Sequence, residues 1–372
     1  MRTNAARPAP VLVAALRLGF LLAVAALLVT GVIGGLLRAG VAIPVPRASA
    51  WPGRAVLGHA FLMICGFLGT VIGIERAVAV RRRVAFAAPL LSALAGLAML
   101  AGDGTAAGWL AVAAAIVFIA VNGVVVERQF AAHTLLLLAG ATVWLVGNVL
   151  NALGSQTAAV VPWWLAFLVL TIAAERLEMT RLMRRRRGAA PALYVLLALL
   201  VLGSALFTLA PAAGGLVYGL ALVGLAAWLA RYDIARRTLA ARGLSRYMAV
   251  CLLSGYCWLA VSGLAWIGAA RGYAVRDVAL HALALGFVFS MMLAHAPVIL
   301  PALTRVKLRF GAFFYVPLAL LHASLVVRLL FGSFDFALLG AGAAGNAIAI
   351  ALFAATLAGS ALAWRLGGAT RA

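Results

Sequence analysis

Acidic residues are scarce in this chain, with only eight Asp and Glu among 372 residues. Charged residues of either sign make up 10% of the sequence, whereas hydrophobic residues make up 66%. So little polar surface cannot cover a soluble globule of this size, and a mean hydropathy of +1.14 agrees with that conclusion. No hydrophilic stretch is long enough to fold as a separate soluble domain. We therefore expect one membrane domain over residues 1–372.

Cysteine is equally scarce. The three cysteines, Cys65, Cys251 and Cys257, fall inside apolar segments and form no CxxC pair. This distribution excludes a disulfide framework and gives no indication of a zinc site. We expect all three to be buried, reduced thiols.

Long apolar runs dominate what remains, and about 20 apolar residues make one membrane-spanning helix. The first run, 11–37, is longer than the core of a signal peptide, so we interpret it as a retained span. The sequence predicts an all-α polytopic transmembrane helical bundle of about 12 spans, near 11–37, 55–80, 84–102, 107–126, 130–153, 159–180, 190–210, 213–231, 245–268, 278–301, 311–331 and 336–364.

Basic residues are abundant, and they give the chain a formal charge of +22. In a soluble protein this charge would suggest nucleic acid, but here the basic residues lie in short loops between apolar runs, so we expect no nucleic-acid partner. With the predicted spans, 24 of the 30 Lys and Arg fall on one side of the membrane. The positive-inside rule makes that side cytoplasmic. Both termini are then cytoplasmic, in a bacterial-type cytoplasmic membrane whose lipid bilayer is the first partner.

All five histidines lie inside predicted spans, where an ionisable side chain is costly and usually faces the bundle interior. His59 and His281 are both near the predicted outer ends of their helices. His133 and His295 are both near the inner ends, and His322 lies in the middle of its span. His281 and His295 are separated by roughly 21 Å along one helix and share a face at about 100° per residue.

Neutral imidazole is a common axial ligand of haem iron and also suits copper. Two histidines at equal depth are what a bis-histidine haem requires. Met63 and Met292 each lie one helical turn from a histidine, His59 and His295, and add soft sulfur of the kind that Cu(I) prefers. The alternative for each histidine is a hydrogen bond to a neighbouring helix, and for each methionine a place in the apolar core.

Acidic residues inside the spans are paired with arginine. Glu75-Arg76 and Glu175-Arg176 lie at cytoplasmic helix ends, and Glu127-Arg128 repeats the pattern at a spacing of about fifty residues. An ion pair between helices would satisfy these groups. The other interpretation is a proton entry point, or an anchor for a haem propionate through Arg76. The spacing is also what a duplicated helical hairpin would produce, although so short a motif recurs by chance.

Two segments resemble the histidine-bearing helices of the NnrS-like membrane proteins, a family linked to nitric oxide and distantly similar to the haem-copper oxidase catalytic subunit. They are RAVLGHAFLMICGFLGTVIGIERAVAV (54–80) and RDVALHALALGFVFSMMLAHAPVILPAL (276–303). The resemblance implies a twelve-helix protein with haem b, copper as a second candidate cofactor, and a role in nitrogen-oxide metabolism. The chain has no adjacent His-His pair and no HxxxY, which argues against oxygen reduction by the oxidase mechanism, and GHAFLM replaces the HxHE-type run around His59.

These patterns predict a membrane haem protein in which His59 and His281 ligate an outer haem, with His133 and His295 as an inner site. It would bind a small diatomic ligand or pass electrons to a redox partner. Two other functions remain open. One is a proton-coupled secondary transporter that uses Glu75, Glu175 and His322. The other is an assembly factor that handles haem or copper transiently.

Overall fold

The protein is seen in a computed structural model that describes residues 10–45, 49–179, 188–304 and 306–369. Several predicted loop arginines lie outside these residues, namely Arg2, Arg7, Arg47, Arg181, Arg184 to Arg187, Arg305 and Arg371.

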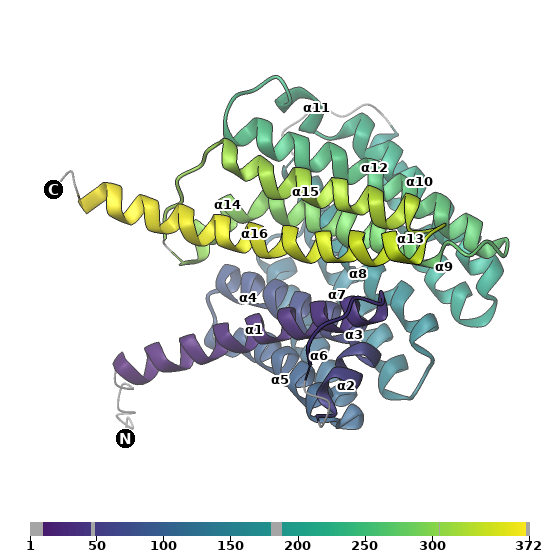
Figure 1. Ribbon diagram of the computed structural model, residues 1–372, viewed down its shortest axis with the longest axis horizontal. Coiled ribbons are helices and arrows are strands. Elements are labelled where there is room, and N and C mark those ends of the chain that lie inside the picture. Colours follow the sequence, from purple (N-terminus) through teal and green to yellow (C-terminus); the bar gives the residue numbers. More distant parts are fainter. Residues whose placement is uncertain (1–9, 46–48, 180–187, 305, 370–372) are drawn as a thin grey trace.

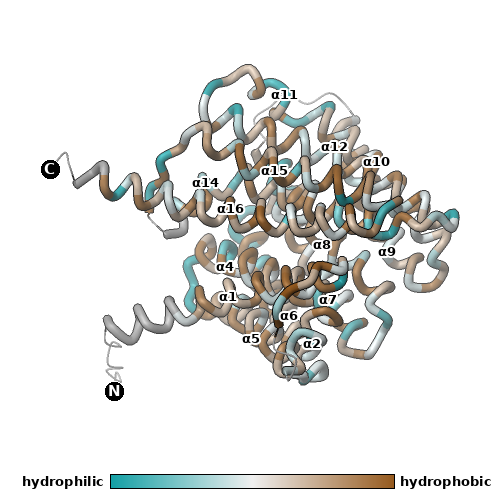
Figure 2. The backbone as a smooth tube through the Cα atoms, in the orientation of Figure 1, coloured by the Kyte–Doolittle hydropathy of each residue, from teal (hydrophilic) through white to brown (hydrophobic). Residues whose placement is uncertain are grey.

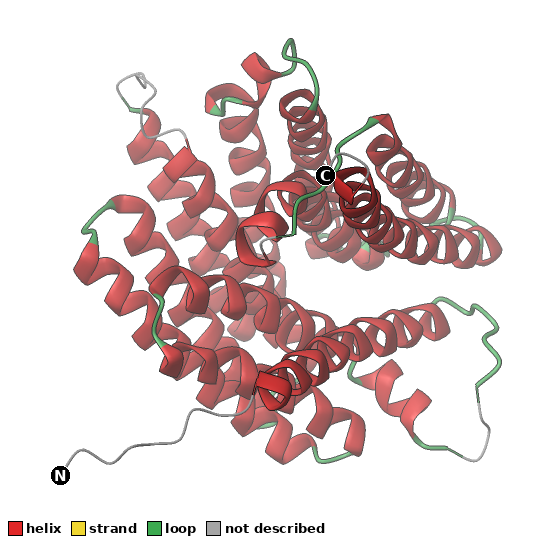
Figure 3. Cartoon of the chain, turned by 90° about the vertical axis from the view of Figure 1, so that its left-hand side faces the viewer, coloured by secondary structure: helices red, strands yellow, loops and turns green. Residues whose placement is uncertain are grey.

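The described residues form helices and contain no strand (Figure 3). The helices of the first half are α1 (Pro10–Arg38), α2 (Trp51–Leu57), α3 (His59–Phe61), η1 (Leu62–Leu68), α4 (Gly69–Val80), η2 (Arg83–Phe86), α5 (Ala87–Ala101), α6 (Gly104–Arg128), α7 (Ala132–Ala152) and α8 (Thr157–Met179). Those of the second half are α9 (Ala189–Leu209), α10 (Pro211–Tyr232), α11 (Ala235–Thr238), α12 (Leu244–Ala270), α13 (Arg276–His281), η3 (Ala282–Phe289), α14 (Ser290–Thr304), η4 (Ala312–Phe314), α15 (Tyr315–Val326), η5 (Val327–Phe331) and α16 (Phe336–Ala369).

Twelve helical stretches within the described residues are long and apolar enough to cross a membrane. They are Gly19–Arg38, His59–Val80, Arg83–Ala101, Gly104–Arg128, Ala132–Ala152, Thr157–Met179, Ala189–Leu209, Pro211–Tyr232, Leu244–Ala270, Arg276–Ala302, Ala312–Phe331 and Phe336–Leu366. The prediction of an all-α polytopic bundle with about twelve spans is thus confirmed. Hydrophobic residues run along the whole length of the helices, and hydrophilic ones gather mainly at helix ends and connections (Figure 2).

The second span begins later than predicted. The backbone N–H of Gly58 closes the short helix α2 by donating to the carbonyl of Arg54, and a new helix begins at His59. The break sets His59 at the first position of the span, where the chain enters the bundle.

The helices form two groups, one from α1 to α7 and one from α9 to α16 (Figure 1). Helix α8 lies between them and is the most deeply buried of the twelve described spans. Helix α8 packs on η1 of the first group and on η3 of the second. Helices α1 and α16 are largely exposed, as expected of spans that face lipid.

Helix α1 begins and α16 ends on the same side of the bundle, at the left of Figure 1. We call this the inner end and the opposite one the outer end. Which compartment each end faces remains the prediction from the basic residues.

Three segments at the outer half are π-helical, with wider turns than an α-helix: η1, η3 and η5. Segment η1 follows the histidine turn of α3, η3 starts directly after His281, and η5 contains Arg328. Short π-helical segments inside α-helices are frequent at functional sites. The space between the three segments is therefore a candidate functional site.

Candidate functional site at the outer end

A cavity of about 380 Å³ lies between the two groups of helices at the outer end. Its size falls within the range of about 300–1,000 Å³ that is usual for small-molecule and cofactor sites. Most of its wall is apolar and comes from α1, η1, α8, η3 and α16. The side chains with coordinating or charged atoms in its lining include His59, Met63, His281, Met292, Asp277 and Arg328.

His59 is held in the cavity wall by helix α1. Its Nδ1 lies 2.7 Å from the carbonyl oxygen of Gly31, a hydrogen bond in which the imidazole donates. The ring also packs on Gly35, where an added Cβ would come within 2.7 Å of the ring carbon Cε1. Glycine is therefore required at position 35 for α1 to approach the imidazole this closely. The contacts fix the ring and leave Nε2 as the unprotonated nitrogen.

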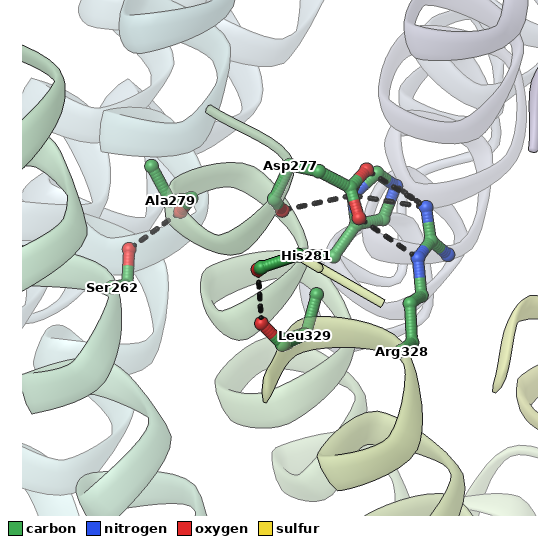
Figure 4. A network of polar contacts seen from close by, with 7 residues as sticks. Ser262, Asp277, Ala279, His281, Arg328 and Leu329 are labelled. Atoms are coloured by element: carbon green, nitrogen blue, oxygen red, sulfur yellow. Dashed lines mark hydrogen bonds and ion pairs between the residues drawn. The ribbon is translucent and has the colours of Figure 1, made fainter. Parts of the chain in front are cut away.

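His281 is held by a carboxylate and a guanidinium. Its Nδ1 lies 2.8 Å from Oδ1 of Asp277, one helical turn earlier. Arg328 binds the same carboxylate through two hydrogen bonds of 3.0 Å, from Nε and Nη2 (Figure 4). The guanidinium Nη2 also lies 3.1 Å from Nε2 of His281. Arg328 is buried, so this network brings a paired charge into the bundle from the eleventh span.

The helix carrying His281 is also braced from α12. Ser262 donates a hydrogen bond of 2.7 Å to the carbonyl oxygen of Ala279, within the turn that holds His281 (Figure 4). This bond ties α13, which directly precedes the π-helical segment η3, to a neighbouring span.

The two outer histidines, which the sequence places at one depth, lie next to each other in space. Their ring centres are 6.3 Å apart and their planes differ by 29°. With nitrogen to metal distances of about 2.0 Å, two imidazoles on opposite sides of one metal ion have ring centres roughly 6 Å apart. Because Nδ1 of each ring is engaged by an oxygen, Nε2 is the ligand atom that each has to offer, as is usual for metal-bound histidines.

The thioethers of Met63 and Met292 line the same cavity. His322 lies elsewhere, where its Nδ1 accepts a hydrogen bond of 2.9 Å from the indole of Trp258. Its Nε2 is buried and has no partner among the described residues. The structure therefore groups His59, His281, Met63 and Met292 in one cavity and separates His322 from them.

The inner histidines have different partners. His295 donates from Nδ1 to the carbonyl oxygen of Met291 and has Nη1 of Arg176 at 3.3 Å from Nε2. His133 has Glu178 at 4.0 Å. An inner haem between these two histidines remains a prediction. Ligation by His295 would require Arg176 to move off Nε2, as ligation by His281 would require Arg328 to move off its Nε2.

The predicted acidic and basic residues of the inner end form ion pairs between helices. Arg76 on α4 binds Glu175 on α8 at 2.9 Å and lies 3.6 Å from Glu75. Arg176 forms a two-bond pair with Asp233, at 2.8 and 2.9 Å. The interpretation of these groups as ion pairs between helices agrees with these contacts.

Sequence reasoning missed Asp233, Asp277 and Arg328. Two signals in the sequence point to Asp277 and Arg328. The motif R-x-V-x-x-H-A occurs twice, at 54–60 and at 276–282, and marks both histidine turns. Arg328 is a lone charge inside an apolar run, which is a functional hypothesis by default. Asp233 carries no such signal, because a loop position looks solvent-exposed in the sequence.

Ligand chemistry further restricts the site. Among residues 10–45, 49–179, 188–304 and 306–369, no group of three or more His, Cys, Asp or Glu could hold a metal ion. A bare metal at the outer histidines would therefore need thioether ligands as well. Haem needs only two axial ligands from the protein, since the macrocycle supplies the other four nitrogen atoms.

Comparison with known proteins gives one match. No curated protein and no solved structure matches the chain. The family described as Domain of unknown function (DUF8744) matches residues 17–362, which include the cavity, both outer histidines and the inner ion pairs. The chain therefore belongs to the DUF8744 family.

Proposed function

We propose that this protein is a membrane haem protein in which Nε2 of His59 and Nε2 of His281 are the two axial ligands of a haem b. The observation that carries the proposal is the pairing of these imidazoles, with ring centres 6.3 Å apart in an apolar cavity. Copper bound by the same histidines with Met63 and Met292 is the second candidate cofactor, because all four side chains line that cavity.

The surroundings of the cavity suit an amphipathic macrocycle. The wall is mostly apolar, as the porphyrin faces require, and the exposed side chains of Arg38 and Arg276 stand at its outer rim, where they can pair with propionates. Arg328 touches Nε2 of His281, so ligation requires this guanidinium to move off that nitrogen. The bond from its Nε to Asp277 does not involve Nη2, the nitrogen at His281, and Asp277 in turn holds Nδ1 of the histidine.

Two protein ligands favour electron transfer as the activity. A haem with both axial positions filled exchanges electrons without a change of ligands, whereas nitric oxide or another diatomic molecule would have to displace one imidazole. The resemblance to NnrS-like proteins keeps nitric oxide as the first diatomic ligand to test. We place the protein in a bacterial-type cytoplasmic membrane with the cavity on the outer side, on the distribution of Lys and Arg.

The alternatives of transient cofactor handling and proton-coupled transport make different predictions. An assembly factor would lose its haem or copper during purification. A transporter using Glu75, Glu175 and His322 would need these groups in one path, and His322 instead pairs with Trp258.

The test is the haem and metal content of the purified full-length protein, produced with ample haem. We expect about one haem per chain in the wild type, and its loss in His59→Ala and His281→Ala. His133→Ala and His322→Ala serve as controls, because neither side chain lines the cavity. A wild-type protein free of haem and of copper would refute the proposal, and so would a haem that survives both cavity substitutions.

A further inference from the structure

Among the residues that the structure describes, the inner end holds a cluster of three carboxylates and two guanidinium groups. Its deeply placed members are the carboxylates of Glu75, Glu175 and Asp233 and the guanidinium groups of Arg76 and Arg176. His295 joins the cluster through Arg176. The cluster is distinct from the outer cavity and does not depend on any cofactor bound there.

Arg176 and Asp233 form the most deeply buried ion pair of this cluster. The two side chains are only 3% and 1% exposed, and they meet through two hydrogen bonds. Oδ1 of Asp233 also accepts a hydrogen bond from the backbone N–H of Ala235. One guanidinium thus cancels one carboxylate.

The remaining arginine faces two carboxylates. Arg76 lies 2.9 Å from Glu175 and 3.6 Å from Glu75, so among the described side chains two acids pair with this one base. The other charged or titratable groups acting on Glu75 are His295 and Glu178, and those acting on Glu175 are Arg176 and Glu178. Glu178 is 46% exposed and is therefore solvated. Two carboxylates that face the same guanidinium repel each other, which favours retention of a proton by one of them.

Arg76 supplies a second observation. Its side chain is 10% exposed, and its Nε is buried with no hydrogen-bond partner among the described residues. The guanidinium therefore has a donor left over beyond the ion pair it makes. When the proton moves from one carboxyl group to the other, the negative charge moves in the opposite direction. With a donor to spare, the guanidinium of Arg76 can then bind whichever carboxylate is ionised.

We propose that Glu75, Arg76 and Glu175 form a proton-binding site, in which the two carboxyl groups share one exchangeable proton taken from water at the inner end. The glutamate side chains are 29% and 26% exposed, so the proton can exchange with water. The site lies below the floor of the outer cavity. Met292 lines that cavity, and His295 of the cluster follows three residues later, roughly 4.5 Å along α14. A proton held here offsets negative charge at the inner end of the bundle.

The test is infrared difference spectroscopy of the purified full-length protein in lipid nanodiscs during a pH titration. A shared proton gives the C=O stretch of a protonated carboxyl group at neutral pH, which moves to lower frequency in D₂O. Either single substitution, Glu75→Gln or Glu175→Gln, leaves one carboxylate facing one arginine, so we expect each to abolish the band. Glu127→Gln is the matched control, because Glu127 also precedes an arginine at an inner helix end but is exposed.

Retention of the band in Glu127→Gln and its loss in both other variants support the proposal. Three outcomes overturn it. The first is a wild-type protein without the band from pH 5 to pH 9, and the second is loss of the band in only one of the two variants. The third is a band whose intensity changes when choline replaces Na⁺ in the buffer. The wild-type titration alone is decisive if the substitutions prevent folding. None of these outcomes depends on whether the outer cavity binds haem.

Discussion

The pair of Arg176 and Asp233 gives the sharpest prediction about stability. Replacing Arg176 with Met leaves the carboxylate of Asp233, 1% exposed, without its charged partner, next to the backbone N–H of Ala235 and the hydroxyl of Tyr256. Breaking a buried ion pair by removing one member costs about 3–5 kcal/mol, because the other charge stays buried without compensation. We expect Asp233→Leu to cost a similar amount for the same reason.

The double variant separates the ion pair from the other contacts of each side chain. With both charges removed, the desolvation cost disappears, and we expect Arg176→Met with Asp233→Leu together to be more stable than the sum of the single variants by about 2–3 kcal/mol. The assay is unfolding of the detergent-purified protein by sodium dodecyl sulfate, followed by tryptophan fluorescence. Arg231→Met is the control, because Arg231 is exposed and its loss should change the unfolding free energy by under about 0.5 kcal/mol. A coupling energy below about 0.5 kcal/mol would show that the two side chains do not stabilise each other in the folded protein.

Three further predictions concern the cavity and the core. Gly35→Ala should displace the adjacent imidazole and lower haem occupancy, whereas Gly19→Ala on the same helix, where an added Cβ meets nothing within 4 Å, should leave occupancy unchanged. Asp277→Asn should weaken cofactor retention by about 10–100-fold, measured by competition with apomyoglobin for haem or with a chelator for copper, because it removes the group that orients a ligand; equal retention would refute that role. Asn148→Ala removes hydrogen bonds to Ala111, Trp164 and Cys65, and at about 0.6 kcal/mol each it should destabilise the protein by roughly 2 kcal/mol in the same unfolding assay; no change would show that these bonds are replaced.

Hydropathy predicted the spans well because helix length and apolar composition are both imposed by the bilayer. Depth in the membrane also follows from position along a span, and this is why His59 and His281 could be expected at one level. Their closeness in the plane of the membrane could not be derived, since depth carries no information on which helices are neighbours. The packing of α8 between the two groups supplies that information.

The partners of the histidines were harder to predict than the histidines themselves. Asp277 and Arg328 are on different spans, and their pairing depends on how η5 packs on α13. The expectation that His281 and His295 share one face assumed about 100° per residue, but π-helical η3 lies between them and its wider turns change the angle.

The central claim is axial ligation by both His59 and His281, and the most direct measurement is the reduced-minus-oxidised optical spectrum of the purified protein with His281→Gly in parallel. The account predicts the sharp α-band of a low-spin, six-coordinate haem in the wild type, its loss in the variant, and its return when free imidazole fills the vacated position. A spectrum that is unchanged in the variant, or a wild-type protein without a haem band, would contradict the account.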